Sequence, residues 1–337
     1  MSEQTSGVVE YPFRAVPWLP GPHAQTIYAA LFRRHANIDL RVERLELDDG
    51  DFVDLAWYGE HRFGHPAVLI LHGLEGDQSS RYVRALIGEL ANRDLSSVVM
   101  HFRSCSGEIN RLARSYHSGE TGDLGEVISR LSERGENIIA AVGYSLGGNV
   151  LLKYLGECAS ETSLQAAAAI SVPFLLDRSA SFLNSGFSRI YERRLVASLR
   201  TKACVKYQRG MLPETIRDPS VFDTFWDFDE WVTAPIHGFA GAKDYYARSS
   251  SRQYLNKITT PTLIVHALDD PFVPPDAVPS SEELSNTVRL ELSKSGGHVG
   301  FIDGGWPGFD ASSLERRIVT HLSQTLESKL KVSANDQ

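Results

Sequence analysis

A serine flanked by glycines is the first feature with a chemical use, since residues 143–148 read Gly-Tyr-Ser-Leu-Gly-Gly and fit the pattern G-x-S-x-G. The apolar run IIAAV precedes the motif and the helix-like NVLLKYLGE follows it, so Ser145 is expected on the sharp strand-to-helix turn that exposes a nucleophile. Such a turn brings backbone so close that side chains would collide, which explains the glycines. The alternative is an ordinary glycine-rich turn, because the motif also arises by chance.

A serine hydroxyl needs a base to accept its proton and an acid to orient that base, and the downstream sequence offers both. His298 lies in the glycine-rich SGGHVGF, after the strand-like TVRLELS, where its imidazole could reach Ser145. Asp269 and Asp270 follow the strand-like TLIVH, which gives the chain order serine, acid, histidine. We expect Asp270 to orient the histidine, with Asp269 as the alternative.

Acyl-transfer chemistry also requires two backbone N–H groups aimed at the oxyanion of the tetrahedral intermediate. One belongs to the residue after the nucleophile, which is Leu146. The other comes from the loop after an earlier strand, and HGLEG at residues 72–76 ends the strand-like PAVLIL, so we assign the N–H of Leu74. His72 could be taken for the base, but a role in orienting this loop is the better interpretation.

Two further strand-to-helix loops, HFRSCSGE and SYHSGETGD, carry polar residues without a catalytic arrangement. Arg103 is expected to form an ion pair with Glu108 or Asp123. Cys105 is interpreted as a small packed thiol, because no partner for a second nucleophile is evident. Neither loop is assigned a catalytic role.

These residues need a framework that brings distant segments to one edge of a sheet. The apolar runs PAVLILH, SSVVMHF, IIAAVGY, AAAAISV and PTLIVHA alternate with helix-like segments, which predicts a mostly parallel, doubly wound α/β sheet. Crossover helices are expected at 82–92, 121–132, 146–156 and 249–256, with a closing helix at 314–330. Residues 40–58 alternate apolar and polar types on either side of Asp-Asp-Gly-Asp, which predicts an antiparallel N-terminal hairpin.

The pattern indicates a single domain with one insertion. The N-terminal extension covers residues 1–38, the core covers 39–172 and 236–330, and a helical insertion at 173–235 interrupts the alternation. We expect the insertion to form a cap over the carboxyl ends of the strands, where α/β sheets bind ligands. Its aromatic residues either line an apolar acyl pocket or form the core of the insertion itself: Phe182, Phe187, Tyr191, Phe225 and Trp226.

Composition excludes several classes of protein. With 42% hydrophobic and 23% charged residues among 337, the chain is not disordered. A net charge of -8 disfavours nucleic acid and anionic lipid as partners, since both need clustered Lys and Arg. Three widely spaced cysteines give no disulfide framework or CxxC metal site. Because no signal peptide and no apolar run of roughly 20 residues is evident, we expect a cytoplasmic protein without a transmembrane segment.

The chain resembles the YheT-like branch of the α/β-hydrolases, which also includes mammalian membrane-anchored lipases and yeast alcohol acyltransferases. The likeness extends over most of the chain and rests on a series of motifs: PWL at 17, HAQT at 23, HGLEG at 72, RSCSGE at 103, YHSGET at 116, GYSLGGN at 143, DYYARSS at 244, DDPFVP at 269 and GGHVGF at 296.

The resemblance implies the α/β-hydrolase fold and carries the nucleophile, acid and base onto Ser145, Asp270 and His298. The chain departs from the family at the start of the Arg103 loop, where His101 and Ser104 replace the usual asparagine and glycine of Asn-x-Arg-Gly. The membrane anchor of the mammalian relatives is not expected here.

Together these observations predict hydrolysis of a small-molecule carboxylic ester through an acyl-Ser145 intermediate, with no metal or organic cofactor. Two alternatives stay open. Acyl transfer to an alcohol uses the same three side chains, and a catalytically silent scaffold would only bind a ligand. The natural ester, its acyl length and the oligomeric state are not encoded in the motifs.

Overall fold

A nine-stranded sheet forms the centre of the computed structural model, which describes residues 6–35, 37–59, 65–304 and 312–335. The strand order is β1-β9-β8-β7-β6-β4-β5-β3-β2. The strands are β1 (Gly7–Glu10), β2 (Arg41–Glu46), β3 (Phe52–Tyr58), β4 (Pro66–Leu71), β5 (Ser96–Met100), β6 (Asn137–Tyr144), β7 (Ala166–Ile170), β8 (Thr262–Ala267) and β9 (Val288–Ser293).

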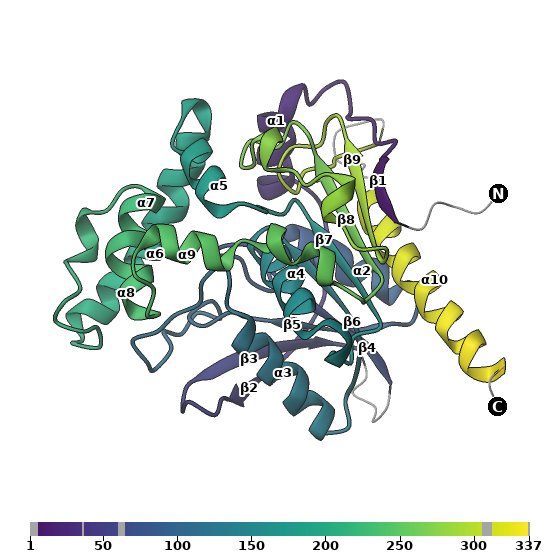
Figure 1. Ribbon diagram of the computed structural model, residues 1–337, viewed down its shortest axis with the longest axis horizontal. Coiled ribbons are helices and arrows are strands. Elements are labelled where there is room, and N and C mark those ends of the chain that lie inside the picture. Colours follow the sequence, from purple (N-terminus) through teal and green to yellow (C-terminus); the bar gives the residue numbers. More distant parts are fainter. Residues whose placement is uncertain (1–5, 36, 60–64, 305–311, 336–337) are drawn as a thin grey trace.

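The strand directions confirm the predicted fold class. β1 and β4 to β9 pair in parallel, whereas β2 and β3 form the predicted antiparallel hairpin and β3 runs antiparallel to β5. The sequence did not indicate β1, which lies in the N-terminal extension and pairs with β9. The first and the last strand of the chain therefore lie side by side at one edge of the sheet (Figure 1).

Ten α-helices accompany the sheet in the described residues: α1 (Gly21–Leu31), α2 (Arg81–Ala91), α3 (Thr121–Glu133), α4 (Leu146–Cys158), α5 (Leu176–Leu183), α6 (Arg189–Gln208), α7 (Phe225–Phe228), α8 (Ala234–Ile236), α9 (Ala242–Ser249) and α10 (Ser313–Asn335). Four of the expected helices are confirmed as α2, α3, α4 and α10. The helix expected at 249–256 is wrong: α9 ends at Ser249, and a 3-10 helix covers Ser251–Lys257.

Hydrogen bonds from side chains to the backbone end α9 at Ser249. Ser250 is extended, with φ -68° and ψ 129°, and its hydroxyl donates to the carbonyl of Tyr246. The next N–H, that of Ser251, donates to Asn149 on α4 at 2.9 Å instead of continuing the helix. Hydrogen bonds of serine and asparagine side chains to the backbone thus replace helical ones here.

The strands bury side chains on both faces. Val68 and Ile70 of β4 belong to a core cluster that includes residues of α2 and α10, whereas Leu69 and Leu71 belong to a cluster with residues of α3 and α4. Because successive side chains of a strand point to opposite faces, these helices cover the two sides of the sheet. The layers are visible in Figure 1.

The chain between β7 and β8 contains α5 to α9, and its first part is residues 173–235, here called the insertion. Its helices lie to one side of the sheet in Figure 1 and have a hydrophobic cluster of their own, which includes Val196, Phe225 and Phe228. That cluster continues into α9 through Tyr245 and Tyr246. The insertion and α9 therefore pack as one helical layer.

Nothing in the described ranges is a helix both long and apolar enough to cross a membrane. All three cysteines are free, and Cys105 is buried as the sequence led us to expect. The cytoplasmic location stays a prediction.

Candidate active site

The turn between β6 and α4 has the strained geometry expected of an exposed nucleophile. Ser145 has φ 51° and ψ -117°, a conformation that residues other than glycine adopt only when the surroundings impose it. A Cβ on Gly143 would lie 2.4 Å from the carbonyl oxygen of Gly147, and one on Gly147 would lie 2.5 Å from that of His72. Both glycines are therefore required for this turn to form.

Ser145, His298 and Asp270 form one line of hydrogen bonds. The distance from Ser145 Oγ to His298 Nε2 is 2.8 Å, and His298 Nδ1 lies 2.8 and 3.0 Å from the two carboxylate oxygens of Asp270. Asp270 is 2% exposed and also accepts the N–H of Phe272 at 2.8 Å. The structure thus brings together three side chains that are 125 and 28 positions apart in the sequence.

Asp269 has a different partner. Its Oδ1 accepts the backbone N–H of Gly297 at 2.9 Å, and burial raises its pKa above the ordinary value. Of the two carboxylates that the sequence offered, Asp270 contacts the imidazole and Asp269 holds the backbone next to His298.

The loop that carries His298 is held by α1, near the other end of the chain. Thr26 Oγ1 accepts the N–H of His298 at 2.9 Å and donates to the carbonyl of Pro22 at 2.8 Å. Gln25 is fully buried and exchanges two hydrogen bonds with the backbone of Ile302. The HAQT motif therefore positions the histidine loop, a role that its sequence alone did not reveal.

Thr26→Val is expected to lower ester turnover by roughly ten-fold, because the variant removes one hydrogen bond worth on the order of 1 kcal/mol from the loop that aims His298. Thr26→Ser keeps the hydroxyl and should restore most of the rate. Steady-state kinetics on a short soluble ester measure both variants. Equal turnover of the valine variant and the unmodified protein would contradict this role for Thr26.

The two residues expected to supply the oxyanion donors, Leu74 and Leu146, line the same cavity as Ser145. Leu146 is the first residue of α4, so its N–H has no acceptor within the helix. The N–H of Leu74 makes no hydrogen bond to any residue that the structure describes. The loop passes close to the serine, since a Cβ on Gly73 would lie 3.4 Å from Ser145 Cβ. Both N–H groups are therefore available to a bound oxyanion.

His72 lies under this loop and is not a partner of Ser145. Its Nε2 accepts the N–H of Phe102 at 3.2 Å, so the proton is on Nδ1, which donates to the carbonyl of Gly73 at 2.7 Å. Burial lowers the pKa of His72 to about 3, which keeps the ring neutral. The side chain connects two strand-to-helix loops.

Phe272 contacts the candidate base directly, and the sequence analysis missed it. Its ring stacks flat on the imidazole of His298, with centroids 3.9 Å apart and planes 2° apart. The ring of Tyr191 in the insertion packs on Phe272 at 5.0 Å. The only sign of this contact in the sequence was the position of Phe272, two residues after Asp270 within DDPFVP. The stack fixes the plane of the imidazole.

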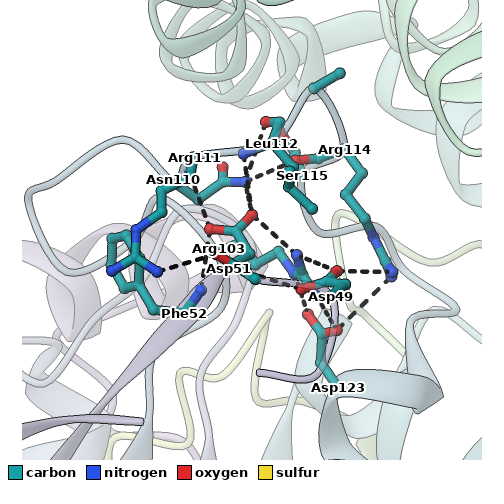
Figure 2. Close-up of polar contacts among 12 residues, drawn as sticks. Asp49, Asp51, Phe52, Arg103, Asn110, Arg111, Leu112, Arg114, Ser115 and Asp123 are labelled. Carbon is teal, nitrogen blue, oxygen red and sulfur yellow. Dashed lines mark hydrogen bonds and ion pairs between the residues drawn. The ribbon is translucent and has the colours of Figure 1, made fainter. Parts of the chain in front are cut away.

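Arg103 forms a largely buried ion cluster that is separate from the hydrogen-bonded line of Ser145, His298 and Asp270. Its guanidinium contacts Asp123 at 2.7 Å, Asp49 at 2.8 Å and Asp51 at 2.9 Å, as Figure 2 shows. Asp123 is therefore the partner among the two that the sequence left open, and Glu108 pairs with Arg44 instead. The cluster ties the β2–β3 hairpin to the start of α3.

Ser104 stands where the family usually has glycine, and its φ of 65° lies in the left-handed region that favours glycine. The serine hydroxyl is used: it donates to Asn110 Oδ1 at 2.5 Å and accepts the N–H of Asn110 at 3.0 Å. These bonds offset the backbone strain of a residue with a side chain at this position.

A largely apolar cavity of about 130 Å³ opens beside Ser145 and His298. The insertion contributes aliphatic and aromatic side chains to it, including Leu176, Leu183, Leu199, Phe225 and Phe228. Of the five aromatic residues considered for an acyl pocket, Phe225 alone lines this cavity. Phe187 is 48% exposed, Trp226 borders a separate surface hollow, and Tyr191 packs on Phe272.

Atoms of three possible metal ligands, His117, Glu120 and His237, fall within 4.8 Å of one another, and the two histidines line the cavity. His117 Nδ1 accepts a backbone N–H, which leaves Nε2 to donate to Glu120 Oε2 at 3.4 Å. Arg114 lies 2.6 Å from that same oxygen. A metal cation bound here would have to displace the guanidinium of Arg114 or overcome its repulsion. We therefore interpret His117, Glu120 and His237 as a hydrogen-bonded group that supports the cavity wall.

Asp229 also lines the cavity. Its raised pKa leads us to expect that the stability of the fold depends on pH. Burial raises its pKa to about 6, although the hydroxyls of Thr233 and Tyr246 donate to it. Because the folded pKa exceeds the unfolded value of about 3.9, this residue stabilises the fold fully below pH 4, and the contribution is lost as pH rises through 6. The loss is on the order of 3 kcal/mol at neutral pH.

Asp229→Asn removes the titration and keeps an oxygen acceptor for one of the two hydroxyls, while its NH2 group can donate to the other hydroxyl oxygen. Denaturant unfolding between pH 4 and 7 should show the free energy of unfolding falling less for the variant than for the unmodified protein. Parallel pH profiles of the two proteins would contradict a raised pKa at this position.

Comparison with known proteins identifies the family of this chain. Residues 66–305 match the family model described as the alpha/beta hydrolase fold. The chain is 42% identical over 315 residues to YheT, a candidate esterase of Escherichia coli, with 91% of this chain and 92% of that protein covered. It is 33% identical over 251 residues to the monoacylglycerol lipase of Saccharomyces cerevisiae, covering 70% and 55% of the two chains.

The solved structure of the esterase Pf2001 of Pyrococcus furiosus is similar in fold, with a TM-score of 0.56, 17% identity, and 87% and 96% of the two chains covered. Sheet order, strand-to-helix turn and sequence likeness over nearly the whole chain lead to one assignment. The chain belongs to the α/β-hydrolase family, in its YheT-like branch.

Proposed function

We propose that this hydrolase cleaves carboxylic esters by a serine mechanism, with Ser145 as nucleophile, His298 as base and Asp270 as the orienting acid. One observation carries the proposal: the continuous hydrogen bonds of 2.8 Å from Ser145 Oγ to His298 and from His298 to Asp270. A nucleophile next to a base that is itself oriented by an acid is the arrangement that acyl transfer requires.

In the first step His298 Nε2 takes the proton of Ser145 as Oγ attacks the ester carbonyl carbon. The N–H groups of Leu74 and Leu146 stabilise the oxyanion that forms. The imidazolium then returns the proton to the departing alkoxide, which leaves an acyl-serine. In the second step His298 takes a proton from water as the water oxygen attacks the acyl carbon. The bond between that carbon and Ser145 Oγ then breaks, His298 returns the proton to Oγ, and the carboxylic acid is released with the serine restored.

Reaction with a fluorophosphonate probe, which bonds covalently to an activated serine, tests whether Ser145 is the nucleophile. The probe should label the unmodified protein once and should not label Ser145→Ala. Circular dichroism of both proteins controls for folding. Absence of labelling in well-folded unmodified protein would favour the catalytically silent scaffold.

The cavity limits the acyl group that we propose as substrate. A cavity of about 150 Å³ lined by apolar side chains takes one benzene-sized group, and the cavity beside Ser145 is of similar size, about 130 Å³. Esters of short and medium acyl chains should therefore react faster than long-chain glycerides. A panel of esters graded by acyl length measures this, and a steady rise in kcat/KM up to the longest chains would contradict it.

Water is the acyl acceptor in this proposal, and an alcohol would use the same three side chains. Graded ethanol in an ester hydrolysis assay separates the two reactions, because free acid and ethyl ester are measured together. Ethyl ester in excess of acid at modest ethanol would replace hydrolysis by acyl transfer.

A further inference from the structure

The loop with the proposed oxyanion donor Leu74 is held in place through its next residue, Glu75. Glu75 has φ 57°, a left-handed conformation that a residue with a side chain keeps only when its contacts impose it. Its side chain is 6% exposed and is not part of the cavity wall next to Ser145. Glu75 therefore does not touch a substrate, and its contacts serve the loop.

Four hydrogen bonds hold Glu75. The hydroxyl of Tyr116 accepts the Glu75 N–H at 2.9 Å and donates to its Oε1 at 2.7 Å. Lys202 Nζ donates to Oε1 at 2.8 Å, and the hydroxyl of Ser198 donates to Oε2. Ser198 and Lys202 are one turn apart on α6, so they lie on the same face of that helix.

Two of these four hydrogen bonds come from Ser198 and Lys202 of the insertion, and Lys202 supplies the positive charge opposite the Glu75 carboxylate. Among the residues that the structure describes, Lys202 is the cation in contact with the Glu75 carboxylate. A largely buried carboxylate that loses its cation keeps an uncompensated charge and moves toward water. Such a movement would displace the adjacent Leu74 peptide.

The side chain of Leu74 provides a second link. It packs against the main core cluster, which includes Leu71 and Leu146, and also against the cluster of the insertion, which includes Val196 and Phe225. The residue with the oxyanion donor is thus fixed from the sheet and from the insertion together.

We propose that α6 of the insertion completes the oxyanion hole, with Glu75 and Lys202 as positioning residues for the N–H of Leu74. Docking of the insertion orders the donor as well as the cavity, and an insertion displaced from the core leaves a serine without its full oxyanion support. This inference rests on the proposed function of Ser145 and Leu74.

Lys202→Met and Glu75→Gln test the proposal on a short substrate, p-nitrophenyl acetate. Loss of one oxyanion donor costs about 100- to 1,000-fold in kcat, so a misplaced donor should cost roughly 10- to 100-fold with KM within about threefold. Affinity for a trifluoromethyl ketone, whose adduct carries the oxyanion, should fall by a similar factor. If Glu75 and Lys202 had a purely structural role, the loss of kcat and the loss of ketone affinity would not be expected to match. The double variant, in which neither charge is left alone, should recover part of the rate.

Arg200→Gln is the matched control, since Arg200 lies on the same helix and pairs with the exposed Asp223. It should leave kcat, KM and ketone affinity unchanged. Tyr116→Phe removes one hydroxyl and keeps the ring, so it provides a test if Lys202→Met fails to fold. The variant loses both hydrogen bonds between Tyr116 and Glu75, and we expect kcat to fall roughly ten-fold.

Unchanged kcat in folded Glu75→Gln, Lys202→Met or Tyr116→Phe overturns the inference, as does a loss confined to KM. The outcome is separable from failure of the proposed function. Unmodified protein without Ser145-dependent turnover defeats the function itself, whereas normal turnover with unaffected variants defeats this inference alone.

Discussion

Ser145→Ala is expected to reduce ester turnover by about a million-fold, the largest effect of any single change in this protein. The variant removes the nucleophile and leaves the cavity, the oxyanion donors and the imidazole in place. The small residual rate should come from binding and oxyanion stabilisation alone. Turnover of p-nitrophenyl acetate per mole of folded protein measures the loss, with circular dichroism of the variant as the control for folding.

His298→Ala should match this loss, because nucleophile and base act as a unit and removing either one disables both. The double variant Ser145→Ala/His298→Ala should be no slower than either single variant. Losses that multiply would show that the two side chains act independently, and the hydrogen bond of 2.8 Å between them would then have no catalytic meaning.

Asp270→Asn is expected to cost about ten-thousand-fold in kcat. The asparagine amide can donate to His298 Nδ1, which then presents its proton on Nε2 toward Ser145 instead of a lone pair. The shape of the site is kept, so KM should change little. Steady-state kinetics near neutral pH measure this, with a thermal melt to confirm that the buried site still folds.

Asp269→Asn is the matched control, one residue away and with the same change of charge. An asparagine oxygen still accepts the N–H of Gly297, so the loss should stay below about ten-fold. Equal losses for the two variants would contradict the assignment of Asp270.

Local sequence was sufficient for the elements that form from neighbouring residues. The strand-to-helix turn at Ser145, the hairpin at 40–58 and four of the helices follow from short apolar periods and glycine positions. The helix expected at 249–256 failed because a contact from Asn149 decides where α9 ends, and that residue is 102 positions from its partner Ser251.

The supporting residues of the site could not be predicted for the same reason. Thr26 acts on His298 across 272 positions, and Lys202 acts on Glu75 across 127. Such pairs have no periodicity, and each residue alone is an ordinary polar side chain. The choice between Asp269 and Asp270 was also open, since adjacent acids on one turn differ only in where the backbone aims them.

The hydrogen bond between α1 and the histidine loop has a consequence for the order in which the enzyme matures. The ribosome synthesises the N-terminal part of the chain first. Thr26 and Gln25 can therefore contact their partners, His298 and Ile302, only after nearly the entire polypeptide has been synthesised. Under the proposed mechanism, a nascent chain therefore contains Ser145 long before His298 is held in place to activate it, so hydrolytic competence arrives late in synthesis.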